Sequence, residues 1–153
     1  MMAVADRLAE LGLVLPPVAA PAGSYVPAVA SGDLVFTSGQ LPFVDGALAR
    51  TGVLGQDVEV QEARDLAATA ALNALATVAE VLGGLDRVVR IVKVTGFVAS
   101  APGFSQQPAV INGASDLLVD VFGDHGRHAR SAVGVAALPL GSPVEVELIA
   151  QFR

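Results

Sequence analysis

The chain has 153 residues, enough for one compact domain, and 53% of them are hydrophobic while 16% are charged. Fifteen acidic residues against nine Lys and Arg give a net charge of −6, which disfavours nucleic acids as partners because these are bound through clustered basic side chains. The absence of cysteine excludes disulfides, thiolate nucleophiles and thiolate metal sites.

Residues 1–17 are expected to form a helical extension with a proline-rich connector, and residues 18–153 a single domain. Apolar residues recur at helical spacing within 3–11, and the prolines that follow favour extended backbone. Charged residues interrupt the apolar start of the chain and no basic segment comes before it, which disfavours a secretion signal. No apolar run approaches the ~20 residues of a membrane helix. We therefore expect a cytoplasmic protein that does not bind membranes and covers apolar surface with copies of itself.

Two elements are predicted before residue 85. The segment GDLVFTSGQLP at residues 32–42 predicts a buried strand that ends at Ser38, because four β-forming residues lie between glycines. From residue 59 to 82, apolar residues recur at three- and four-residue steps with polar residues between them. This pattern predicts a long amphipathic helix that ends at Gly83 and Gly84.

The second half of the chain predicts a strand, a helix and two further strands. DRVVRIVKVTGFV at residues 86–98 is typical of a central strand covered on both faces. INGASDLLVDVFG predicts a helix from Ile111 to Gly123, and strands follow within 129–136 and 144–152. The order of elements predicts an α/β (α+β) sandwich in which both helices cover one face of a mixed sheet.

Alternation assigns two faces to each of the last two strands. In the first strand, Arg130, Ala132 and Gly134 share one face and valines occupy the other. In the second strand, apolar residues share one face, and Glu145 and Glu147 lie on the opposite face. We expect the polar or small-residue face of both strands to point away from the helices.

Arg130 and Glu145 are the candidate reactive residues. The guanidinium fork of Arg130 fits a carboxylate in a bidentate manner, although an arginine in a structural ion pair is the commoner case. Glu145 can hold and polarise a water if it is enclosed at an interface, whereas an outward strand glutamate is usually only solvated. The two strands run in opposite directions, so we expect these residues roughly 20 Å apart in one chain. A small ligand can contact both only if a second subunit contributes one of them.

Other candidate sites are weaker, and no metal or cofactor is expected. His125 and His128 supply at most half of a metal site, and two histidines without an acidic partner are more typical of a solvated loop. The segment TSGQLP lacks the spacing and the lysine of a phosphate-binding loop. Tyr25 is the only tyrosine, and packing is its more common role.

Four segments, GSYVPAV, LVFTSGQLP, HARSAVGVAALP and VEVELIAQF, occur in this order within residues 18–152. Together they resemble the Rid proteins, also called the YjgF family, whose archetypal members hydrolyse reactive enamines and imines. The Ala-Arg-Ser segment with its following Leu-Pro is the most specific part. The resemblance implies a chorismate-mutase-like fold and a homotrimer with three ligand clefts between subunits. It also implies that the last strand lies between two earlier core strands, while the arginine-bearing strand takes an edge.

The same resemblance implies roles for individual residues. Arg130 matches the arginine that binds the substrate carboxylate, and Glu145 matches the acidic residue associated with the water in the cleft. Ala132 stands where many members have cysteine, at a position that contributes its backbone N–H. The other residues that match positions lining the cleft are Tyr25, Ser38, Gly39 and Asn112.

The chain departs from the family pattern at His128, where proline is common, and at Gly134, where glutamate is frequent. The implied activity is cofactor-free hydrolysis of a 2-imino acid to a 2-oxo acid and ammonia. The implied partners are a small carboxylate-bearing imine or 2-oxo acid and further copies of the chain. Three alternatives remain: non-catalytic binding or sensing of small 2-oxo acids, a different lyase or deaminase step, and RNA cleavage, which the acidic composition disfavours.

Overall fold

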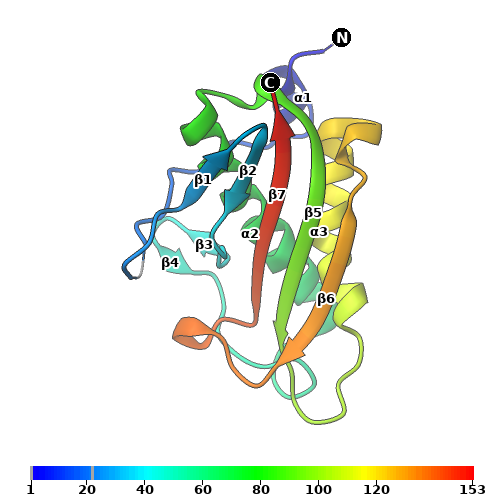
Figure 1. Cartoon of the computed structure of the whole chain (residues 1–153). Coiled ribbons are helices and arrows are strands. Elements are labelled where there is room, and N and C mark those ends of the chain that lie inside the picture. Colours follow the sequence, from blue (N-terminus) through cyan, green and yellow to red (C-terminus); the bar gives the residue numbers. More distant parts are fainter. Residues whose placement is uncertain (1, 22) are drawn as a thin grey trace.

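The computed structural model describes residues 2–21 and 23–153 of the chain. Its main feature is a five-stranded mixed sheet in the order β1-β2-β7-β5-β6 (Figure 1). β6 pairs with β5 in parallel, and the other neighbouring strands are antiparallel. β7 lies between β2 and β5 while β6 takes an edge, which confirms the strand order that the resemblance implied. The strands are β1 (Ala28–Ser31), β2 (Leu34–Thr37), β5 (Val88–Ala99), β6 (Ala129–Val135) and β7 (Val144–Phe152).

Three short strands were not expected from the sequence. β1 forms a hairpin with β2 around Gly32, whose φ of 61° is in the left-handed region that glycine adopts readily. β3 (Phe43–Val44) and β4 (Ala47–Leu48) pair with each other outside the main sheet. β1 was not predicted because Pro27 comes directly before it. Proline argues against a strand except at strand starts and edges.

Two long helices, α2 (Val60–Leu82) and α3 (Gln107–Phe122), cover one face of the sheet (Figure 1). α2 ends at Gly83, whose φ of 78° confirms the predicted glycine cap. α3 begins at Gln107, four residues before the predicted start at Ile111. The difference arises at Pro108, which lies in the first turn, where a helix needs no backbone N–H.

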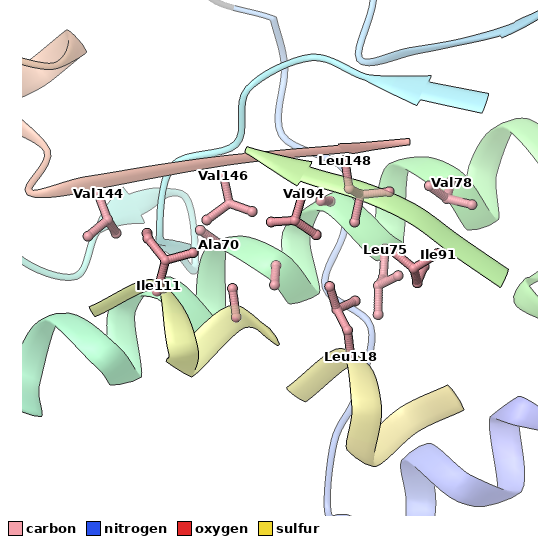
Figure 2. Packing of buried hydrophobic residues seen from close by; sticks show 14 of the residues in the cluster. Ala70, Leu75, Val78, Ile91, Val94, Ile111, Leu118, Val144, Val146 and Leu148 are labelled. Atoms are coloured by element: carbon pink, nitrogen blue, oxygen red, sulfur yellow. The ribbon is translucent and has the colours of Figure 1, made fainter. Parts of the chain in front are cut away.

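The hydrophobic core lies between these helices and the sheet (Figure 2). The fully buried residues that meet there are Leu75 and Val78 of α2, Ile111 and Leu118 of α3, Ile91 and Val94 of β5, and Val144 and Val146 of β7. The apolar face of β7 therefore packs against the helices as predicted. Glu145 and Glu147 lie on its opposite face.

The predicted orientation of β6 is wrong, because its small residues face α3 instead of pointing away from it. Arg130 bonds to side chains of α3, and Ala132 packs against the core. A Cβ on Gly134 would come within 2.8 Å of Nε2 of Gln107, so the missing side chain leaves room for the first turn of α3. Val133, on the other face, is 43% exposed.

The prediction that both faces of β5 are covered is also wrong for a single chain. Ile91, Val94 and Val98 are buried under the helices, whereas alternate residues on the other side, such as Phe97, are only half-buried. We call the helix-free side of the sheet the open face. Phe36 and Val133 also lie on it, and both are more than a third exposed.

The N-terminal helix α1 (Val4–Glu10) packs on the helical side of the domain. Its Leu8 is buried in the core. The backbone N–H of Val4 donates to Asp86 at 2.8 Å, and Nε of Arg7 donates to the carbonyl oxygen of Asp120 at 2.7 Å. These contacts attach α1 both to α3 and to the turn that follows α2.

Among residues 2–21 and 23–153, α2 alone is long and apolar enough to cross a membrane by length and composition. The apolar window is 61% buried inside the protein. The core helix of a folded domain meets the same criteria, and α2 packs against both α3 and the sheet.

Candidate functional site

Arg130 lies on β6, and its side chain is held against α3. Nη1 donates to Oδ1 of Asn112 at 2.8 Å and to Oγ of Ser115 at 3.2 Å. Nη2 is 3.4 Å from the carbonyl oxygen of Pro108. Asn112 and Ser115 are three residues apart on a helix, a spacing that places both on the same side. The structure therefore brings the predicted residues Arg130 and Asn112 into direct contact.

Only neutral groups bind the Arg130 guanidinium within the described part of the chain. The salt bridges found there belong to other arginines: Arg7, Arg50, Arg64 and Arg127. The commoner interpretation, a structural ion pair, therefore does not apply among these residues. Nη1 uses both of its hydrogens, which leaves Nε and one hydrogen of Nη2 as a side-on fork suited to a carboxylate.

His128 extends this network through both of its ring nitrogens. Its Nε2 is 2.9 Å from Oγ of Ser115, and its Nδ1 is 2.6 Å from the carbonyl oxygen of Gly126. Burial lowers the pKa of His128, and the positive charge of Arg130 lowers it further, against an opposing effect of the Gly126 carbonyl. Within residues 2–21 and 23–153, no group of three or more possible metal-binding side chains occurs.

Backbone amides along the edge of β6 point toward solvent. The carbonyl oxygen of Val135 accepts the N–H of Ser100 at 2.9 Å, which directs Val135 and every second residue before it toward β5. The N–H groups of Arg130, Ala132 and Gly134 therefore point outward from the edge. The N–H of Ala132 lies two residues from Arg130 on the same strand, and a methyl side chain leaves a ligand room to approach it.

Glu145 packs against Gly39 near the start of β7. A Cβ on Gly39 would overlap Oε1 of Glu145, so the carboxyl group occupies space that only glycine leaves free. Paired backbone bonds between Gln40 and Val146, of 2.8 and 3.0 Å, hold the two segments together. Burial raises the pKa of Glu145, and the charge of Glu147 raises it further. A carboxyl group with a raised pKa is better suited to exchange protons near neutral pH.

A small cavity of about 100 Å³ lies beside Glu145 and is lined in part by Tyr25. The hydroxyl of Ser38 donates to the carbonyl oxygen of Val26 at 2.6 Å. The backbone N–H of Ser38 donates to the carbonyl oxygen of Pro27 at 2.8 Å. These bonds fix the segment that carries Tyr25, which is 49% exposed. Tyr25 and Glu145 are thus brought together, and Ser38 contributes by holding the backbone next to Tyr25.

The predicted site residues form two separate groups in one chain. Arg130 pairs with Val94 on one side of β5, and Glu145 pairs with Phe97 on the other side. Three residues along the strands and two strands across correspond to roughly 14 Å between the Cα atoms of Arg130 and Glu145. The expected 20 Å is an overestimate. Val133 in the middle of β6, and not the end of that strand, lies level with Glu145, because both residues pair with Phe97. The side chains of Arg130 and Glu145 nevertheless point to opposite faces of the sheet, so one small ligand cannot contact both within a chain.

Sequence reasoning missed Ser115 and the role of His128. The available signal was the spacing of Asn112 and Ser115, which places two polar groups on one side of the helix. With Arg130 predicted to point away from the helices, this spacing did not indicate a contact with Arg130. His125, the other histidine, is exposed.

Residues 5–152 match the family described as "YjgF/chorismate_mutase-like, putative endoribonuclease". The chain is 48% identical over 151 residues to Protein TCP17 of Trypanosoma cruzi, which covers 98% of this chain and 94% of that protein. It is 37% identical to a 2-iminobutanoate/2-iminopropanoate deaminase of Salmonella typhimurium, over 86% of this chain and 89% of the relative.

The fold agrees with these sequence matches. The crystal structure of "a putative endoribonuclease" from Shewanella oneidensis has a TM-score of 0.96 and 36% identity to this chain, and the match covers 99% of this chain and 100% of that one. A family match over nearly the whole length, relatives above 30% identity and the same arrangement of sheet and helices agree with one another. The chain belongs to the YjgF family, which is also called the Rid family.

Proposed function

We propose that the protein hydrolyses reactive 2-imino acids, the tautomers of 2-enamines, to 2-oxo acids and ammonia. The observation that carries this proposal is the guanidinium of Arg130, which neutral groups hold in place while its Nε–Nη2 edge is left for a carboxylate. A relative with 37% identity is named as a deaminase of 2-iminobutanoate and 2-iminopropanoate, which are small substrates with a carboxylate.

Each step of the reaction has a group in the chain that suits it. Arg130 binds the carboxylate, and the outward N–H of Ala132 stabilises the polarised centre beside it. Glu145 takes a proton from a water that adds to the iminium carbon, which gives a tetrahedral carbinolamine. Glu145 then returns the proton to the nitrogen and takes the hydroxyl proton as the C–N bond breaks, so that the C=O bond of the 2-oxo acid forms and ammonia leaves. Transfer of this last proton to the ammonia restores the Glu145 carboxylate. The iminium carbon is already electrophilic, and this scheme therefore uses no cofactor or metal.

The scheme requires a second subunit, and we propose a homotrimer in which Glu145 of one chain faces Arg130 of the next. The separation of the two residues on opposite faces of the sheet supports this arrangement. The open face supports it as well, because its exposed apolar side chains favour contact with another chain. We also propose a cytoplasmic location.

A coupled assay tests the proposal. A serine or threonine dehydratase releases the imino acid, and formation of the 2-oxo acid is followed with and without the purified protein. We expect the protein to accelerate this step and Arg130→Ala to abolish the acceleration while the assembly stays intact. Acceleration by Arg130→Ala equal to that of the unmodified protein would contradict the role of Arg130.

The alternative function is non-catalytic binding of small 2-oxo acids. The observation that favours it is that the Arg130 group is complete within one chain, whereas Glu145 lies on the other side of the sheet. A pure binder would bind 2-oxobutanoate and lose this binding in Arg130→Ala, yet leave the rate of oxo-acid release unchanged. The coupled assay therefore separates the two functions.

RNA cleavage is named in the family description and is the least supported function for this chain. The net charge of −6 and a single lysine provide no basic surface that would bind a phosphate backbone. We expect an RNA titration at two salt concentrations to show no binding that weakens with salt. Strong, salt-dependent binding would instead favour a nuclease.

A further inference from the structure

Ser115 lies between Arg130 and His128 and contacts both. Its Oγ is 3.2 Å from Nη1 of Arg130 and 2.9 Å from Nε2 of His128. The other ring nitrogen of His128, Nδ1, is 2.6 Å from the carbonyl oxygen of Gly126. The four groups therefore form one continuous line of hydrogen bonds from the turn after α3 to β6.

The chemistry of the groups fixes the direction of each bond. The Gly126 carbonyl only accepts, so Nδ1 of His128 carries the hydrogen. In the neutral ring, Nε2 then has a lone pair and accepts the hydroxyl hydrogen of Ser115. The lone pairs of Ser115 are thereby left for Nη1 of Arg130. Burial and the nearby charge of Arg130, which lower the pKa of His128, favour this neutral form.

We propose that Ser115 and His128 are positioning residues for Arg130, an inference that rests on the proposed use of Arg130 to bind a carboxylate. Asn112 and Ser115 occupy both hydrogens of Nη1, which prevents the guanidinium from rotating. His128 acts one step further away, because it holds the Ser115 hydroxyl in the orientation that presents lone pairs to Arg130. The Nε–Nη2 edge is thus fixed before the ligand arrives, which lowers the entropic cost of binding.

The first test measures the affinity for 2-oxobutanoate in variants of both residues. Ser115→Ala removes one bond to Arg130, and we expect the Kd to rise roughly threefold to tenfold. His128→Leu removes the acceptor for Ser115 and should weaken binding to a similar degree. His128→Gln places an amide oxygen near the position of Nε2, so its Kd should stay within about twofold of the unmodified protein.

The double variant Ser115→Ala/His128→Leu distinguishes positioning from general damage. If His128 acts through Ser115, the second substitution adds nothing to the Kd of Ser115→Ala. We call the proposed action of His128 on Arg130 through Ser115 the relay. Additive effects of the two substitutions on the Kd would overturn the relay, as would unchanged affinity in both single variants. Unfolding curves of each variant show whether weaker binding comes instead from loss of structure.

A second measurement needs no ligand. Nitrogen-15 NMR of the histidine rings at pH 8 reports which ring nitrogen carries the hydrogen, and we expect the Nδ1–H tautomer for His128. An Nε2–H tautomer would overturn the relay even if Arg130 binds carboxylates. If the unmodified protein binds no 2-oxobutanoate, or if Arg130→Ala binds it equally well, the proposed function fails, and the tautomer alone decides whether the relay exists. The two failures are thus distinguishable.

Discussion

At the scale of single residues, Arg130 and His128 form hydrogen bonds only with neutral groups among the described residues. Arg130 is surrounded by an amide, a hydroxyl and a carbonyl, and His128 by a hydroxyl and a carbonyl. Neutral partners leave the charge of Arg130 uncompensated, which is costly unless solvent or an anion approaches. This arrangement supports the proposed binding of an anion by Arg130.

The lowered pKa of His128 predicts how stability depends on pH. In the unfolded chain the ring titrates near its ordinary pKa of ~6.5, whereas the folded chain resists protonation. The unfolded state thus binds more protons between these two pKa values, so stability is full above about pH 6.5 and decreases as the pH falls below it. We expect His128→Gln to flatten this part of the profile, measured by urea unfolding between about pH 5 and 8.

The exposed histidine provides the control for that measurement. His125→Gln removes one histidine at a position without the contacts of His128. Equal flattening of the profile by both substitutions would show that the burial of His128 is not the cause.

At the scale of elements, the contact between the end of β2 and the start of β7 places Glu145. Gly39→Ala puts a methyl group where the Glu145 carboxyl lies, and we expect the carboxyl to swing aside. Because a flexible side chain can move at low cost, stability should fall by only about 1 kcal/mol, near the low end for overpacking. Activity in the dehydratase-coupled assay should fall by about tenfold or more, since general acid–base catalysis contributes at least that much.

A double variant tests whether the loss of stability in Gly39→Ala comes from the overlap with the Glu145 side chain. Glu145→Ala removes the atoms that the new methyl group would meet, so adding Gly39→Ala to it should cost little further stability. A full, additive loss in that background would mean that Gly39 matters for its backbone conformation and not for the space beside Glu145.

The elements also show what could be predicted from the sequence. Strong periodicity identified α2 and the apolar face of β7, because both depend on burial that the sequence pattern records directly. The orientation of β6 could not be read from the pattern, since Ala132 and Gly134 fit equally well under a helix or against another chain. The start of α3 was missed because Pro108 indicates a break unless it lies in a first turn. Only the resemblance placed Arg130 and Asn112 at the same cleft, and their hydrogen bond was not predicted.

At the scale of the whole molecule, the sheet separates the two halves of the proposed site. Arg130 and Asn112 lie on the helical side, whereas Tyr25 and Glu145 lie near the other face. In the proposed reaction, a monomer would bind the carboxylate through Arg130 but could not bring its own Glu145 to it. The open face, with Phe36 and Val133 exposed, is the surface on which a partner chain would complete the site.

This division predicts complementation between two inactive variants. Arg130→Ala and Glu145→Gln are each expected to be inactive alone. When they are refolded together in equal amounts, a site that takes its arginine from one chain and its glutamate from the next receives both in about a quarter of cases. The mixture should therefore recover about a quarter of the original activity per site, measured in the dehydratase-coupled assay.

Sites built within one chain would give a different result. Every chain in the mixture lacks one of the two residues, so no combination would restore activity, and an inactive mixture would contradict the shared site. The double variant Arg130→Ala/Glu145→Gln provides the matched control, refolded with an equal amount of unmodified protein. A shared site then retains about a quarter of the activity per site, whereas a site within one chain retains about half. Only a shared site gives about a quarter of the activity in both mixtures, and failed reassembly cannot produce activity from two inactive variants.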